Sequence, residues 1–215
     1  KKKMKNLFFG GSSEISIKLA KISHDIYNIS RKRNKKFKKN FILKDYSETE
    51  LSKKLKLLKK TKFDNIMIFN GIFGQSFLSN YSHKEFRKIL NTNLETPLLI
   101  SSLCISEKIL NKNGCIYFVS SLASTKPEIG NAYYALSKNA LNYASQILNM
   151  EQKKRCIRFN SILLGLIESK MSDKLINSIP LIKKKELKFT NLDKVKKRIK
   201  NLFEDNNING KIIKI

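Results

Sequence analysis

Short apolar runs alternate with longer amphipathic stretches along the whole chain, and this alternation is what most constrains its fold. The apolar runs cover residues 6–9, 25–30, 41–43, 65–70, 114–120, 157–163 and 211–215. Helical patterns lie between them, at residues 14–23, 48–60, 84–110, 131–151 and 192–203. Strands that alternate with helices are typical of parallel crossover units. The order therefore predicts an α/β fold, a Rossmann-like doubly wound parallel sheet of seven strands with helices on both faces.

Length and composition favour a single domain over residues 1–215. A chain of this size can bury one sizeable core, and no linker rich in proline or glycine divides it. We expect residues 84–110 to form one long helix with a bend at Pro97. No apolar run approaches the ~20 residues of a membrane span, and the basic start is followed too soon by Glu14 to be typical of a signal peptide. The dispersed cysteines indicate a reducing compartment and no metal site, so we expect a cytoplasmic protein.

The chain is extremely basic, with 44 Lys and Arg against 17 Asp and Glu and a net charge of +27. Such a charge by itself favours a polyanionic partner. The lysines are spread along the sequence, however, and the chain is also rich in Ile and Asn, which share A/T-rich codons with Lys. Genome composition therefore explains most of the charge, and we expect no specific nucleic-acid partner. If part of the charge has an electrostatic role, we expect it in the dense basic run at residues 31–40.

Tyr134 and Lys138 form the pair of residues most indicative of catalysis. At positions i and i+4 of a helix they lie on the same face, so the ammonium can approach the phenol. A nearby cation favours the phenolate, and we expect Lys138 to lower the pKa of Tyr134 towards the working range of a general acid or base. Ser121 lies thirteen residues before the tyrosine, and Asn93 lies a further twenty-eight before the serine. The serine hydroxyl and the asparagine amide at these intervals, together with the phenol and the ammonium, indicate a catalytic site that passes a proton to a carbonyl oxygen.

A glycine turn at Gly10 follows the first apolar run, in FFGGSSEIS. Placed at the start of the next helix, its backbone amides and the helix dipole form an anion site suited to a pyrophosphate. A glycine turn in this position, directly after the first strand, favours a dinucleotide cofactor.

Together these motifs resemble the short-chain dehydrogenase/reductases, in particular ketoreductases with an Asn-Ser-Tyr-Lys tetrad. The matches span the chain and are Gly10 in the first turn, Asn70 in FNGI, Asn93 in NTNL, Ser121 in FVSS, Tyr134 and Lys138 in YALSK, and LGLIESKM at residues 164–171. The resemblance implies an NAD(P)-dependent oxidoreductase that interconverts a carbonyl and an alcohol by hydride transfer. Tyr134 would act as general acid or base and Ser121 would bind the carbonyl oxygen. Lys138 would also hold the nicotinamide ribose, and Asn93 a water of the proton relay.

The resemblance also implies where the cofactor binds. The expected cofactor-binding residues are Gly10, Ser12, Ser13, Ile15, Ser30, Arg31, Lys32, Asp45, Asn70, Gly71, Tyr134, Lys138, Ile167 and Ser169. Relatives that use NAD usually end the second strand with an acidic residue that binds the ribose 2′-hydroxyl. This chain has Arg31 and Lys32 there, which suit a 2′-phosphate, so NADPH is expected over NADH.

Two departures concern how ligands are held. Glu14 stands where the family has its second glycine, and a carboxylate there repels a pyrophosphate unless its side chain points away. The segment 172–188, where the family builds its substrate lid, is short and basic, so a 3-oxoacyl thioester and an activated keto sugar both stay open as substrates. The alternative is a catalytically impaired protein of the same fold that senses the cofactor or binds a polyanion. The resemblance further implies a homodimer or homotetramer formed through the long helices 84–110 and 131–151.

Overall fold

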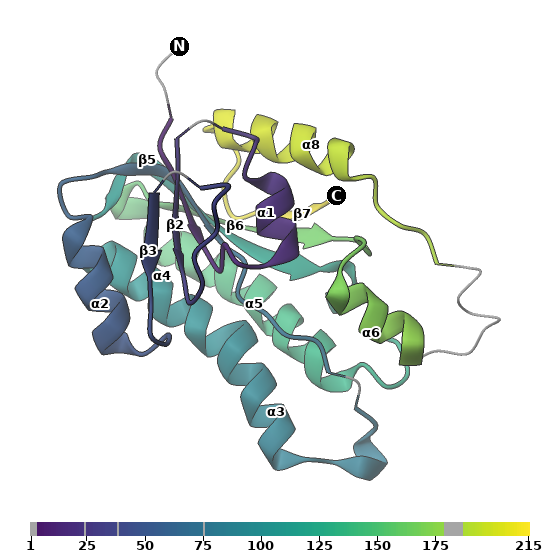
Figure 1. The fold of residues 1–215 in the computed structure, drawn as a ribbon. Coiled ribbons are helices and arrows are strands. Elements are labelled where there is room, and N and C mark those ends of the chain that lie inside the picture. Colours follow the sequence, from purple (N-terminus) through teal and green to yellow (C-terminus); the bar gives the residue numbers. More distant parts are fainter. Residues whose placement is uncertain (1–3, 24, 38, 75, 179–186) are drawn as a thin grey trace.

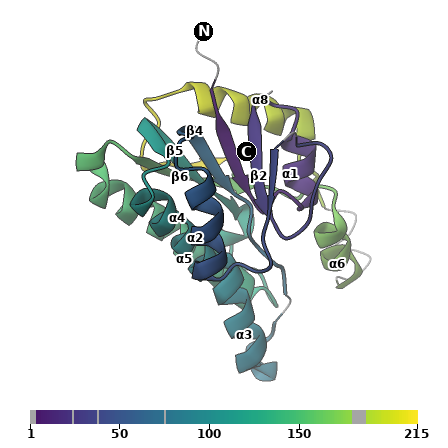
Figure 2. The same cartoon turned by 60° about the vertical axis from the view of Figure 1, so that its left-hand side comes forward.

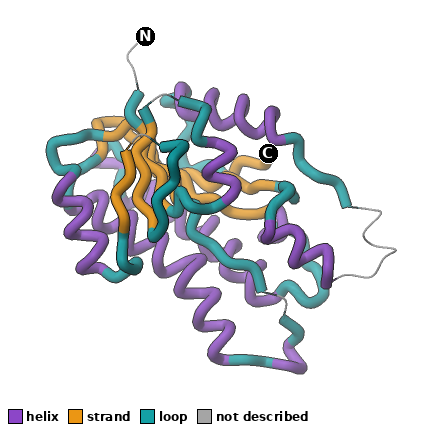
Figure 3. Tube along the Cα trace, viewed as in Figure 1, coloured by secondary structure: helices purple, strands orange, loops and turns teal. Residues whose placement is uncertain are grey.

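The computed structural model describes residues 4–23, 25–37, 39–74, 76–178 and 187–215. The strands are β1 (Asn6–Phe9), β2 (Ile26–Ser30), β3 (Lys39–Ile42), β4 (Phe63–Ile68), β5 (Leu110–Ser121), β6 (Arg158–Leu164) and β7 (Ile212–Lys214). The helices are α1 (Glu14–Leu19), α2 (Glu48–Leu57), α3 (His83–Leu90), α4 (Thr96–Ser106), α5 (Ala132–Glu151), α6 (Lys170–Ser178) and α8 (Leu192–Glu204). Figure 3 shows how the strands form one central layer between the helices.

The strands form one seven-stranded sheet in the order β3-β2-β1-β4-β5-β6-β7. Every adjacent pair is parallel, as the register of β1 with β2 and with β4 illustrates. The chain moves outward from β1 in one direction and then returns to continue from β4 in the other, so the sheet is doubly wound. The predicted fold class is confirmed.

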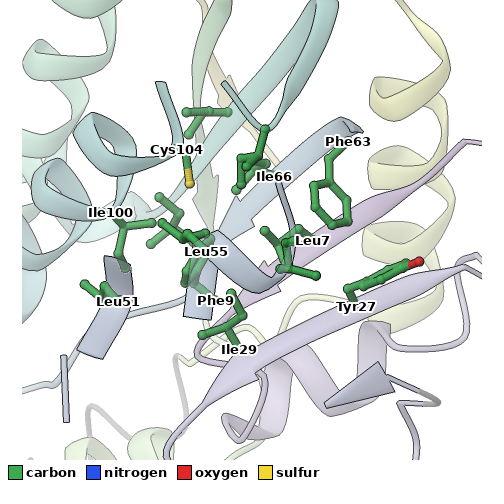
Figure 4. Packing of buried hydrophobic residues seen from close by; sticks show 14 of the residues in the cluster. Leu7, Phe9, Tyr27, Ile29, Leu51, Leu55, Phe63, Ile66, Ile100 and Cys104 are labelled. Carbon is green, nitrogen blue, oxygen red and sulfur yellow. The ribbon is translucent and has the colours of Figure 1, made fainter. Parts of the chain in front are cut away.

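Helices cover both faces of the sheet (Figures 1 and 2). On one face, α2, α4 and α5 pack through Leu51, Leu55, Ile100, Cys104 and Leu141 onto side chains of the strands. Figure 4 shows this packing at close range, with Leu7 and Phe9 of β1 at its centre. On the other face, α1 and α8 pack through Leu19, Val195, Ile199 and Leu202. The two cores hold the sheet rigidly, and so they fix the positions of the strand ends where ligands of such folds bind.

The prediction of one long helix over residues 84–110 is wrong in its details. A π-helical turn, Asn91–Glu95, separates α3 from α4, and Leu110 already belongs to β5. Pro97 does not mark the centre of the bend but lies in the first turn of α4. Because proline has no N–H, it cannot form the α-helical hydrogen bond to the carbonyl of Asn93, which favours a wider turn there. The π-helical turn carries Asn93 into the interior, where it is fully buried.

Several other bounds differ from the prediction. Helix α1 stops at Leu19 and α2 at Leu57, both shorter than expected, while β5 begins four residues early at Leu110. Helix α6 forms the described start of the segment expected as a substrate lid, and the residues 179–186 of that segment lie outside the described part. Among the helices that the structure describes, none is both long and apolar enough to cross a membrane. The same described residues contain no group of three or more His, Cys, Asp or Glu side chains placed to hold a metal ion.

Candidate active site

A cavity of about 260 Å³ opens at the carboxyl ends of β4, β5 and β6. Most of its wall is apolar, with Phe69 and Phe73 following β4 and Leu166 following β6. Met171 of α6 contributes from the segment expected as a lid. Against this apolar wall stand a few polar side chains, which the sequence separates widely and the parallel sheet brings together.

Tyr134 and Ser121 lie next to each other in the wall of this cavity. Ser121 ends β5, and Tyr134 lies in the first turn of α5, the helix that follows. Burial raises the pKa of the Tyr134 phenol above its ordinary value, and a hydrogen bond with the Ser121 side chain opposes that rise. The ring of Phe73 contacts the Tyr134 ring edge-on, with 5.3 Å between centroids. The expectation that Lys138 lowers this pKa is wrong for the structure, in which desolvation dominates.

Lys138 lies one turn further along α5, in the wall of the same cavity. Its side chain is buried, and Nζ donates a hydrogen bond to the carbonyl oxygen of Val119 at 2.8 Å. Burial lowers the pKa of this ammonium to about 8. A Cβ atom added at Gly71 would come within 3.0 Å of Nζ, so only glycine leaves the ammonium accessible from that side. The lysine is therefore charged at neutral pH but releases its proton more easily than an exposed lysine.

Asn93 holds the loop that follows β4 against Lys138. Its Oδ1 accepts a hydrogen bond from Ile72 N at 2.8 Å, and its Nδ2 donates to Ile72 O and to Ser137 Oγ. Most of the side chain's hydrogen-bonding capacity is therefore used in positioning Gly71 and Ile72. The expected role in a water relay stays a prediction.

The glycine turn is built as the sequence predicts. Gly10 has φ +75°, a conformation that glycine adopts without strain, and its carbonyl accepts from Ser13 N at 2.9 Å. Ser13 caps α1 by accepting a hydrogen bond from Ser16 N, and Ser16 Oγ donates back to Ser13 O at 2.7 Å. A Cβ atom at Gly10 would lie 3.3 Å from Asn70 N and Oδ1, so the ends of β1 and β4 approach closely. Ser12 is exposed on this turn, and Ile15 reaches the cavity.

Glu14 does not point into the turn. Its Oε2 accepts a hydrogen bond from the backbone N–H of Lys170 at 2.7 Å, at the start of α6. Lys18, one turn along α1, donates from Nζ to the carbonyl oxygen of Glu168 at 2.7 Å. Two contacts therefore join α1 to the segment that leads into α6, and the carboxylate at the second glycine position is engaged elsewhere.

The basic loop after β2 is ordered by contacts within the loop and with the sheet. Ser30 is buried, and its hydroxyl donates to Lys32 O at 2.7 Å. Arg31 and Lys32 are exposed, and the guanidinium of Arg31 lies over the ring of Tyr46 at 5.8 Å from its centroid. A hydrogen bond with the Ser47 side chain lowers the pKa of the Asp45 carboxyl group, and so does the hydrogen bond that Asp45 accepts from Ser47 N at 2.9 Å.

The predicted site residues thus fall into two adjoining groups. The cavity is lined by Ser121, Tyr134, Lys138, Gly71, Ile15, Ile167 and Ser169. The other predicted residues lie at or just after the ends of β1 to β4 and do not line the cavity; they are Gly10, Ser12, Ser13, Asn70, Ser30, Arg31, Lys32 and Asp45. Asn93 lies next to Gly71, because a Cβ atom added at Gly71 would be 3.7 Å from Asn93 Oδ1.

Sequence reasoning missed Tyr46 and assigned no part to Asn131. Burial raises the pKa of the Tyr46 phenol, while Asn70, Arg31 and the backbone of Gly10 lower it, so this ring lies where three strand ends meet. Asn131 is a buried residue of the cavity wall. No local pattern identifies either, although their positions directly after Asp45 and just before the Tyr134 helix offered a hint. Tyr133, the neighbour of Tyr134, packs against Phe86.

Comparisons with protein families, curated proteins and solved structures agree on one family of proteins. The family model described as short chain dehydrogenase matches residues 36–179. Among curated proteins, the 3-oxoacyl-[acyl-carrier-protein] reductase FabG of Rickettsia conorii is 29% identical over 117 residues, 54% of this chain and 48% of that protein. The enzyme of the same name from Rickettsia prowazekii is 26% identical over 181 residues, 79% of this chain and 75% of that protein. The chain thus spans about half the length of the first and three quarters of the second.

Two solved structures share the fold. A short chain dehydrogenase family protein from Francisella tularensis has a TM-score of 0.86 at 18% identity, with 100% of this chain and 97% of that chain covered. A short chain dehydrogenase from Burkholderia cenocepacia, solved in complex with NADP, has a TM-score of 0.81 at 18% identity, with 100% and 96% covered. At these identities the likeness concerns the fold alone.

Proposed function

Because the chain belongs to the short-chain dehydrogenase family, we propose that it is an NAD(P)-dependent oxidoreductase that interconverts a carbonyl and an alcohol. The observation that carries this proposal is the cavity in which Ser121, Tyr134 and Lys138 meet beside Gly71. A hydroxyl, a phenol and an ammonium at one apolar cavity are suited to binding a carbonyl oxygen and giving it a proton.

The residues present fit a nicotinamide dinucleotide. Gly10 allows the ends of β1 and β4 to approach closely, because a Cβ atom there would lie 3.3 Å from Asn70 N and Oδ1. Its turn leads directly into α1, whose first backbone N–H groups would face a phosphate. Asn70 Oδ1 is buried without a hydrogen-bond partner at the same point. Gly71 leaves Lys138 Nζ accessible for ribose hydroxyls, and Ile167 lies in the cavity wall. When bound, the cofactor supplies the hydride.

In the proposed reaction, Ser121 donates a hydrogen bond to the substrate's carbonyl oxygen and orients it towards Tyr134. Tyr134 gives its proton to that oxygen as negative charge develops there. The raised pKa of Tyr134 keeps the phenol protonated in the resting state, as a proton donor must be. Once the phenolate forms, the Lys138 ammonium on the same face of α5 stabilises it.

Lys138 would then return a proton to Tyr134, and a water held by Asn93 would replace the proton of Lys138 from solvent. The Lys138 pKa of about 8 makes it a ready donor at neutral pH. Asn93 keeps its carbonyl oxygen without an α-helical donor, because Pro97 has no N–H to offer at the i+4 position. That oxygen is the atom we assign to the relay water, since the carboxamide is already bonded to Ile72 and Ser137.

For the substrate, we favour a 3-oxoacyl thioester over an activated keto sugar. A sugar carries several hydroxyls that each need a partner, whereas this cavity presents mainly apolar side chains such as Phe73, Leu122 and Met171. The names of the Rickettsia relatives, which are 3-oxoacyl-[acyl-carrier-protein] reductases, support the same choice.

For the cofactor, we favour NADPH over NADH. The strand β2 ends in the buried Ser30, where relatives that use NAD usually have an acidic residue. The exposed Arg31 and Lys32 follow directly. A guanidinium and an ammonium there would pair with a 2′-phosphate. A cation–π contact with the Tyr46 ring helps to hold the Arg31 guanidinium in this position.

We further propose that two copies of the chain associate through α5. Along this helix the exposed apolar residues Leu136, Tyr143, Ile147 and Met150 recur at spacings of seven, four and three, which places them on one stripe. Their side chains are 41–76% exposed. A second copy of the same helix would cover them. The cytoplasmic location stays a prediction.

The alternative of an impaired, cofactor-sensing or polyanion-binding protein is not favoured. It rested on Glu14 as a sign of a decayed phosphate turn, and Glu14 is instead bonded to Lys170 N. The test is a screen of NADPH oxidation over 3-oxoacyl thioesters, keto sugars and quinones. Turnover of a 3-oxoacyl thioester supports the proposal. Absence of turnover on every carbonyl, together with salt-sensitive binding to generic DNA, would favour the alternative.

A further inference from the structure

Asn131 is a polar residue of the cavity wall whose side-chain oxygen has no hydrogen-bond partner. It is 6% exposed, and its Oδ1 atom is buried without a hydrogen bond. Buried amide groups in native proteins are almost always paired, so an unpaired one at a ligand cavity needs an explanation.

The position of Asn131 in the fold removes the ordinary explanation. It is the N-cap residue of α5, where an asparagine side chain usually accepts a hydrogen bond from the second or third N–H of the helix. Here the Asn131 side chain caps nothing, because Ser76 Oγ accepts from Tyr133 N at 3.2 Å in its place. The neighbouring loop therefore caps the helix and leaves the Asn131 carboxamide for the cavity.

Asn131 also lies close to the reacting group along the chain. It is the N-cap of α5, and Tyr134 lies in the first turn of that helix. Both line the cavity. A substrate whose reacting oxygen meets Tyr134 would thus place the atoms next along its chain beside Asn131.

The two serines that α6 and the residue before it contribute to the cavity wall are already hydrogen-bonded. Ser169 Oγ donates to Ile167 O, and Ser172 Oγ donates to Ser169 O at 2.7 Å, so both hydroxyl protons are already used. Asn131 is thus an uncommitted carboxamide beside Tyr134, and the carboxamide can rotate to present its nitrogen or its oxygen.

We propose that Asn131 is a specificity-determining residue whose Nδ2 donates a hydrogen bond to a second carbonyl oxygen of the substrate, two carbons from the reacting one. This inference rests on the proposed function and deepens it. A 3-oxoacyl thioester has such an oxygen in its thioester group, and Asn131 distinguishes it from a simple ketone.

The test compares two substrates in three variants. One substrate is a short 3-oxoacyl thioester of N-acetylcysteamine, and the other is the matching ketone in which CH₂ replaces the thioester carbonyl. The variants are Asn131→Leu, which removes the carboxamide, Asn131→Asp, which keeps its size but loses the donor, and Asn207→Leu. The last makes the same chemical change at an exposed position after α8, far from the cavity.

Both Asn131 variants should lower the ratio of kcat/KM for the thioester to that for the ketone by about tenfold, mostly through KM. Asn207→Leu should leave the ratio unchanged. Binding of the 3-hydroxyacyl thioester product, measured by calorimetry, should weaken by a similar factor in the Asn131 variants. NADPH affinity and circular dichroism report whether each variant is folded. If Asn131→Leu does not fold, Asn131→Asp provides the test.

A ratio within about twofold of the wild type in both Asn131 variants would overturn the proposal. So would full activity of Asn131→Asp on the thioester, because a carboxylate cannot donate. If the wild type reduces simple ketones but not the thioester, the proposed substrate class fails first, and the role of Asn131 falls with it.

Discussion

Glu14 Oε2 accepts a hydrogen bond from Lys170 N at 2.7 Å, and this bond connects the glycine turn to helix α6. The two residues are 156 positions apart in the sequence. Helix α6 contributes Met171 and Ser172 to the cavity wall. The Glu14 carboxylate therefore holds the start of α6 against the glycine turn, and its charge faces the N–H groups at the start of that helix.

Replacing Glu14 should affect the substrate more than the chemistry. Glu14→Gln keeps an oxygen that can accept from Lys170 N, whereas Glu14→Ala does not. We expect Glu14→Ala to raise the substrate KM several-fold with kcat little changed, because one of the two contacts that join α1 to the start of α6 is lost. Glu14→Gln should remain within about twofold of the wild type. Steady-state kinetics on both variants decide this, and an equal change in the two would show that the hydrogen bond is not responsible.

The pH dependence of reduction should report Lys138. Burial lowers its pKa from 10.5 to about 8, so the ammonium predominates below about pH 8 and is lost above it. The pKa of Tyr134 is raised, so the phenol stays protonated over the same range. We expect kcat/KM to fall as the pH rises through about 8. A profile that stays flat up to pH 9.5 would contradict a role for the charged lysine.

Arg31 should determine the choice of cofactor. Arg31→Leu removes the guanidinium over the Tyr46 ring, and we expect the dissociation constant of NADPH to rise about tenfold, with that of NADH within about twofold. Arg33→Leu is the matched control, since Arg33 is exposed in the same loop. Fluorescence titration with each cofactor measures the effect without turnover. An equal loss in the two variants would indicate general charge attraction instead of a 2′-phosphate contact.

The exposed stripe on α5 should hold two copies together. Tyr143→Glu puts a charge in the middle of the stripe, and we expect a shift from dimer or tetramer towards monomer in sedimentation velocity. Leu57→Glu, at an apolar side chain that is 66% exposed on α2, is the control and should leave the assembly unchanged. Assembly of Tyr143→Glu identical to the wild type would place the interface elsewhere.

The sequence was most informative where structure depends on local pattern. Strand β1 has the predicted bounds, and the alternation of strands and helices was enough to predict a doubly wound parallel sheet of seven strands. The carboxyl ends of parallel strands meet at one edge, which is why residues as distant as Gly71 and Ser121 could be assigned to one site in advance.

Features that depend on contacts distant in sequence could not be predicted. The π-helical turn at Asn91–Glu95 has no periodicity of its own, and Pro97 suggested only a bend. The direction of Glu14 depends on Lys170, and the freedom of Asn131 depends on Ser76. The Tyr134 pKa was misjudged because the i,i+4 spacing gives the proximity of a charge but not the extent of burial.

The central claim is that Tyr134 transfers the proton, and Tyr134→Phe tests it most directly. Phenylalanine keeps the ring that contacts Phe73 and removes only the hydroxyl. Tyr133→Phe is the control, since the Tyr133 hydroxyl accepts from Ser82 N at 2.8 Å in a packing role. We predict that Tyr134→Phe binds NADPH as the wild type does but loses at least about 100-fold in kcat. Retention of more than about a tenth of the wild-type kcat, a barrier change under ~1.4 kcal/mol, would contradict the assignment.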